Sequence, residues 1–202
     1  MTVTDAITAI SALAAASTFL WGVNAWRREF IGRRRIELVE NVLASFYEVE
    51  DAIREIRNPF SFIGEGKSRK RSEQERSELS ELFDRAYIVF ERYEKRKRLF
   101  AELRSMKYRV MVAFGHDEGK PFEELAGVLN DIFRSAQMLG REYWPKQGKT
   151  AMNDEQLKKY IDEMEKHEAV FWYFGEDQDT IGPRVRAIVN KVESLARKTV
   201  SS

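Results

Sequence analysis

Hydrophobic side chains recur every three or four positions along most of the chain, which is the spacing of one face of an α-helix. The first such stripe consists of Val39, Val42, Phe46, Val49, Ile53 and Ile56. Comparable stripes occupy residues 72–114, 121–144 and 153–174, and a last one follows Pro183. No segment alternates apolar and polar residues for long enough to indicate a β-strand. The pattern therefore predicts an all-α protein.

Capping and helix-breaking residues mark where these helices begin and end. Asn58-Pro59 closes the first stripe, and Gly115 stops the second as a C′ residue. Asn153 and Gln156 have the spacing of a capping box at the start of the fourth helix. These signals predict an antiparallel bundle of about five helices, two of them long, and the second long enough to project beyond the bundle.

The N-terminal segment differs from the rest because residues 6–26 carry no charged side chain. At 1.5 Å per residue such a helix spans about 30 Å, the thickness of a hydrocarbon core, and Trp21 and Trp26 lie towards its end. Five basic residues follow: Arg27, Arg28, Arg33, Arg34 and Arg35. We expect residues 1–26 to be a transmembrane helix, single-pass in the inner membrane with the N-terminus outside. Residues 27–202 would then form a cytoplasmic helical bundle, with the arginines at lipid phosphates.

The composition of this segment leaves other interpretations open. It is rich in Ala, Ser and Thr, so its hydrophobicity is modest and also fits an interfacial or soluble helix. Small or weakly polar residues recur on one side at alternating spacings of four and three: Thr4, Thr8, Ser11, Ala15, Thr18 and Gly22. Small residues let helix backbones approach closely, so this stripe predicts self-association. The ordinary composition of a single-span anchor explains it equally well.

Composition excludes several kinds of chemistry. The chain has no cysteine, so disulfides, thiol nucleophiles and cysteine-ligated zinc are ruled out. The formal net charge of +1 gives little support for a nucleic-acid partner. A zinc protease would need a second histidine four residues after His167, and Phe171 stands there. We therefore expect no metal and no cofactor, and interpret His167 as a partly buried, hydrogen-bonded side chain.

Two groups of polar residues are candidates for binding or catalysis. The first is a basic turn in the second helix, a candidate contact for an anion or a protein partner: Arg92, Lys95, Arg96, Lys97 and Arg98. A solvated helix surface is the alternative. The second is Arg109 followed by His116 after six residues, which resembles the Rx4–6H motif of HEPN-like ribonucleases. That resemblance implies phosphate binding by the arginine and acid–base catalysis by the histidine. Val110 departs from the motif, which usually has a polar residue there.

The chain also resembles small bacterial single-pass membrane proteins with no assigned activity, over residues 26–55 (WRREFIGRRRIELVENVLASFYEVEDAIRE) and 107–115 (KYRVMVAFG). More distantly, it resembles the membrane-anchored, HEPN-like accessory protein of Cas13b CRISPR systems. That second resemblance implies an oligomeric membrane pore, or a ribonuclease, in antiviral defence. The residues themselves favour a non-catalytic protein that acts by self-assembly, as a homo-oligomer, or by binding a protein partner.

Overall fold

The computed structural model describes residues 3–175 and 179–201, without the side chains of residues 1–14, 16 and 20. Over these residues the chain is helical and contains no strand, which confirms the predicted fold class. Its five α-helices are α1 (Val3–Ile56), α2 (Ser77–Phe114), α3 (Lys120–Met138), α4 (Asp154–Phe171) and α5 (Gly182–Val200). Short helices flank α3: the 3-10 helices His116–Gly119 and Trp144–Lys146 and the π-helix Leu139–Tyr143.

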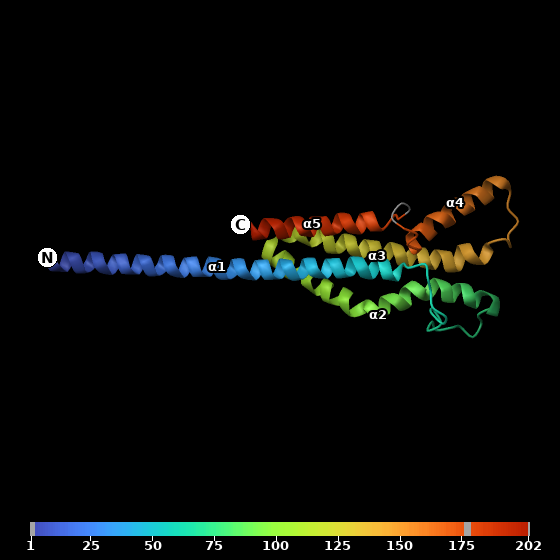
Figure 1. The fold of residues 1–202 in the computed structure, drawn as a ribbon, viewed down its shortest axis with the longest axis horizontal. Coiled ribbons are helices and arrows are strands. Elements are labelled where there is room, and N and C mark those ends of the chain that lie inside the picture. Colours follow the sequence, from blue (N-terminus) through green and yellow to red (C-terminus); the bar gives the residue numbers. More distant parts are fainter. Residues whose placement is uncertain (1–2, 176–178, 202) are drawn as a thin grey trace.

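The C-terminal part of α1 packs between α2 and α5 (Figure 1). Helices α2 and α5 lie along it and run in the opposite direction, and α3 contacts both of them. Helix α4 packs on α3 and extends at an angle away from α1. The N-terminal part of α1 projects well beyond the other helices. The 54 residues of α1 make a helix about 80 Å long.

The predicted apolar stripe of α1 forms the centre of the core. Its six members are at most 2% exposed: Val39, Val42, Phe46, Val49, Ile53 and Ile56. Val89 of α2, Ile132 of α3 and Val189 of α5 are also fully buried. Each such side chain contributes about 1.5–3 kcal/mol when it leaves water. Along α1 the described buried positions begin at Leu38, so the bundle encloses only the C-terminal third of this helix.

The helix boundaries follow the capping signals closely. Gly115 ends α2 with a φ of 114° and donates its backbone N–H to the Met111 carbonyl. The capping box is complete: the Asn153 side chain accepts the Gln156 backbone N–H, and the Gln156 side chain accepts the Asn153 backbone N–H. Three boundaries differ from the prediction by several residues: α2 begins at Ser77 and not at residue 72, α3 ends at Met138 and not at residue 144, and α4 ends at Phe171 and not at residue 174.

The predicted membrane location is contradicted. Over the residues that the structure describes, no helix combines the length and the apolar character that a membrane crossing requires. In the described part of the uncharged run, Ser17, Thr18, Gly22 and Asn24 dilute the apolar side chains. The single-pass inner-membrane location predicted from residues 6–26 is therefore wrong on this finding. The segment is instead the first part of a helix that continues unbroken into the bundle.

Candidate functional site

The projecting part of α1 exposes large apolar side chains. Phe19 and Trp21 are each 71% exposed, and Trp26 is 66% exposed. Val23 and Phe30 are also exposed, and the rings of Trp26 and Phe30 stack with their centroids 5.6 Å apart. Side chains of this kind normally face a core or a partner, so their exposure here marks a candidate interaction surface.

Four of these residues share one face of the helix. Phe19, Val23, Trp26 and Phe30 are separated by four, three and four positions, the a/d spacing of a coiled coil. We call these four residues the aromatic seam. The sequence prediction did not identify this seam, because it interpreted the uncharged run as a membrane span with Trp21 and Trp26 at its end and expected assembly through the small residues. The signal was present in the spacing of the large side chains.

The small-residue stripe predicted for assembly lies beside this seam. Ala15, Thr18 and Gly22 are exposed, and a Cβ built on Gly22 would meet no atom within 4 Å. The side chains of Thr4, Thr8 and Ser11 lie outside the described residues. Helix packing through this stripe stays a prediction.

A second group of exposed apolar side chains lies where α1 enters the bundle. Tyr108 and Val112 of α2 are exposed, and they line a recess together with Ile31 of α1. The basic residues near this point are exposed: Arg27, Arg28, Arg33, Arg34 and Arg35. Three of them make local contacts: Arg33 pairs with Glu29, Arg34 lies 4.8 Å from the Phe30 ring, and Arg35 lies 5.8 Å from the Phe114 ring.

The basic turn of α2 does not form an open cationic patch. Arg92 is buried and donates to the carbonyls of Asn58 (2.6 Å) and Phe60 (2.7 Å) and to the Glu65 carboxylate (2.7 Å). It therefore holds the segment that follows α1 against α2. The other four are exposed and ion-paired: Lys95 with Glu91, Arg96 with Glu55, Lys97 with Glu94 and Arg98 with Glu102.

Arg109 and His116 are both exposed, and no described contact joins them. Arg109 lines the recess beside Tyr108 and Val112, whereas His116 begins the 3-10 helix beyond Gly115. A role of these two residues in phosphate cleavage, as the resemblance implies, stays a prediction.

His167 is half-buried, as expected, and its Nδ1 lies 3.1 Å from the Ser135 hydroxyl oxygen. Burial lowers its pKa from the ordinary value, so the neutral imidazole is favoured. The ring also stands 5.3 Å from that of Tyr143. This histidine joins α3 to α4 within the fold, which is a structural role.

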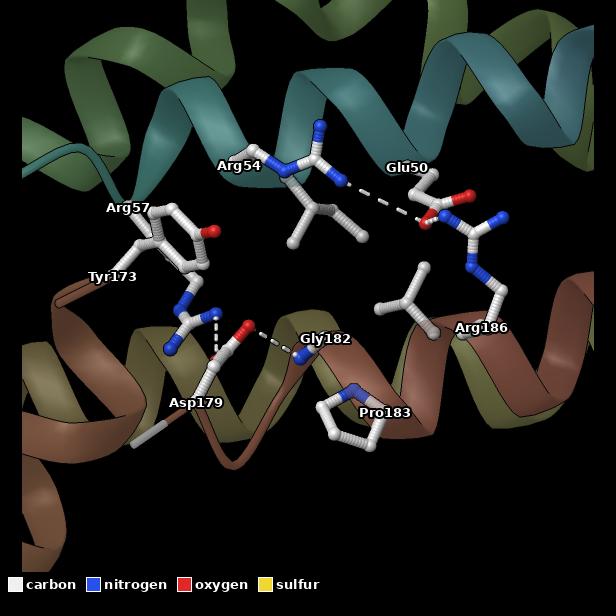
Figure 2. A pocket seen from close by; sticks show the side chains of 10 residues that line it. Glu50, Arg54, Arg57, Tyr173, Asp179, Gly182, Pro183 and Arg186 are labelled. Atoms are coloured by element: carbon white, nitrogen blue, oxygen red, sulfur yellow. Dashed lines mark hydrogen bonds and ion pairs between the residues drawn. The ribbon is translucent and has the colours of Figure 1, made fainter. Parts of the chain in front are cut away.

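A buried ion pair joins the end of α1 to the C-terminal helices (Figure 2). Arg57, only 1% exposed, pairs with Asp179 at 2.7 Å and donates to three carbonyls at the end of α4: Ala169, Val170 and Trp172. Asp179 in turn accepts the backbone N–H of Gly182 at the start of α5. Periodicity could not reveal this cluster, because its members lie more than a hundred positions apart in the sequence.

A cleft of about 240 Å³ opens above this ion pair, between α1 and α5 (Figure 2). Glu50 bridges Arg54 and Arg186 across it, at 3.8 and 2.7 Å. Every charged group that lines the cleft is thus engaged with another. This arrangement is a clamp between α1 and α5.

No family model, curated protein or solved structure matches this chain.

Proposed function

We propose that the protein acts by self-assembly without catalysis, and that the projecting part of α1 pairs with the same segment of a second copy. The observation that carries this proposal is the exposed aromatic seam, Phe19, Val23, Trp26 and Phe30, on which no other described element packs. An isolated helix is marginally stable in water, so a projecting helix gains most from a partner that covers its apolar face.

The size of the seam supports a second copy of this chain as the partner. A buried aromatic side chain contributes roughly 150–250 Å² of contact area, so the six aromatic rings of two seams bring the interface to roughly 1,000 Å². That is the lower range for a specific protein interface. Residues flanking the seam, such as Gly22, add contact area and allow close approach.

The charges favour an antiparallel arrangement of the two helices. A parallel pair would place the arginines at 27–28 and 33–35 of both chains side by side, where like charges repel. In an antiparallel pair centred on the seam, Phe19 of one chain lies level with Phe30 of the other. The arginines at 33–35 then lie opposite the alanines at 14–16, and the two bundles stand at opposite ends.

Single cysteines can test this arrangement, because the chain has none of its own. A mixture of Phe19→Cys and Phe30→Cys proteins should form a disulfide-linked heterodimer under mild oxidation. Each variant alone should form little of its own dimer. Leu157→Cys, on the exposed surface of α4, gives the background from random collision.

Two outcomes would contradict the proposal. Efficient dimers of Phe19→Cys with itself would indicate parallel helices and overturn the antiparallel arrangement. Cross-linking of the mixture no faster than that of Leu157→Cys would count against pairing through the seam altogether.

A further inference from the structure

A second cleft, of about 440 Å³, lies between α2 and the C-terminal end of α3. Small residues form its base: Ala86 and Ala136 are buried, and so is Gly140. Phe83, Tyr87 and Phe90 of α2 line one side. This volume falls in the range of small-ligand sites, which are largely apolar with a few polar groups at the edge.

The base of this cleft depends on an unusual backbone. Gly140 belongs to the π-helix Leu139–Tyr143, where a wide turn interrupts the regular end of α3. A Cβ on Gly140 would lie 2.6 Å from the Cβ of Ala86, so only glycine allows this approach. π-turns are uncommon and occur frequently at functional sites.

The aromatic side of the cleft is held in place by ring stacking. Tyr87 stacks on Phe90 with centroids 5.6 Å apart and planes 24° from parallel. Phe90 stacks in turn on Phe133 of α3, at 4.9 Å and 19°. A nearly parallel, supported set of rings offers a flat surface to a planar ligand.

Cationic groups lie at the edge of the cleft. The Arg69 guanidinium lies 5.4 Å from the Phe83 ring, but it is already paired with Glu75 and Asp84. Lys70 and Arg141 are different: within the described residues, the side chain of neither makes a hydrogen bond or an ion pair. Two uncommitted cations beside an aromatic surface are suited to a ligand that combines a ring with a negative charge.

We propose that this cleft binds a planar aromatic anion of nucleotide size, with its ring against the Tyr87 side and its phosphate or carboxylate between Lys70 and Arg141. The site lies on the bundle and does not include the aromatic seam. It can therefore be present whether or not the protein self-assembles.

Titration calorimetry with adenosine 5′-monophosphate tests the site on the full chain. Saturable binding with one site per chain is expected, and both adenosine and inorganic phosphate should bind at least about tenfold more weakly, because each lacks one of the two contacts. Phenyl phosphate should retain measurable binding, since it keeps both a ring and a phosphate.

Charge-removing variants locate the site. Lys70→Ala and Arg141→Ala should each weaken binding of adenosine 5′-monophosphate about tenfold. Lys67→Ala, in the same loop, and Arg134→Ala, on α3, remove exposed cations that do not line the cleft and should leave the affinity unchanged. Circular dichroism of each variant separates loss of binding from loss of fold.

Three results would overturn the proposal: no saturable binding of either phosphate-bearing ring compound, equal binding of inorganic phosphate alone, or equal weakening by the Lys67 and Arg134 controls. The first would show that the cleft takes no such ligand. The second would remove the role of the aromatic side, and the third would show attraction to surface charge in general.

Discussion

Two arginine side chains, those of Arg57 and Arg92, are buried in this fold. Each donates hydrogen bonds to backbone carbonyls and pairs with one carboxylate. Arg57 follows α1 directly, and the Arg92 side chain of α2 reaches the end of α1. At a helix end four carbonyls lack partners within the helix. Burial lowers the pKa of Arg57, and the ion pair with Asp179 opposes that shift. A guanidinium suits this position because it offers five donors in a fixed plane.

Removing one member of this buried pair should strongly destabilise the protein. We expect Arg57→Met to lower the free energy of unfolding by about 3–5 kcal/mol, because Asp179 would remain buried without its partner. Arg54→Met, in the same turn, removes only partly exposed ion pairs and should cost under about 1 kcal/mol. Urea unfolding followed by circular dichroism measures both. Equal effects would show that Arg57 is not a clamp.

Glu75 gives a prediction for pH. Hydrogen bonds from Arg69, and then from Ser80, lower the pKa of Glu75 from 4.5 to about 2. Because the folded pKa is the lower one, this carboxylate stabilises the fold above about pH 4.5, and the benefit is lost as the pH falls towards 2. Wild type should therefore melt at a higher temperature than Glu75→Gln at neutral pH. The two curves should converge in acid; a constant difference down to pH 2 would contradict the assignment.

At the scale of the elements, hydrophobic periodicity was a reliable guide. It predicted the buried face of α1 residue by residue, from Val39 to Ile56, because burial on one helix face repeats with the helix itself. The capping box likewise predicted the start of α4, because a cap depends only on residues that are close in the sequence. Neither periodicity nor capping signals could predict long-range contacts. Nothing near Arg57 in the sequence indicates that it pairs with Asp179. The basic turn shows the same limit, since burial of Arg92 depends on a loop that folds back over α2.

The π-helix is the element that the sequence did not reveal. Gly140 in this helix lies close to Ala86, which gives a direct test of packing. Gly140→Ala should destabilise the protein by about 1–3 kcal/mol through overpacking, and Ala86→Gly in the same chain should relieve much of that cost. Gly127→Ala, where a Cβ meets nothing within 4 Å, should instead stabilise by up to about 1 kcal/mol. A neutral Gly140→Ala would contradict the close approach.

At the scale of the whole molecule, the unusual feature is a helix that begins far outside the bundle and ends inside it. The uncharged run at residues 6–26 predicted a membrane span, but among the described residues no helix is long and apolar enough for a crossing. The fold makes the aromatic seam visible as a surface, because the same helix buries its other face only from Leu38 onward. The proposed assembly through this segment would account for both the length of α1 and its exposed aromatic side chains.

The mass of the purified full-length protein, measured by sedimentation equilibrium, tests this account most directly. Wild type should sediment at about twice the chain mass of 23.6 kDa. The double variant Phe19→Ser/Trp26→Ser should sediment at the mass of one chain and retain its helical circular dichroism. Leu157→Ser/Ile161→Ser, which removes exposed apolar side chains from α4, should still sediment as the wild type does. A wild-type mass equal to one chain at all concentrations, or a seam variant that keeps the wild-type mass, would contradict assembly through the aromatic seam.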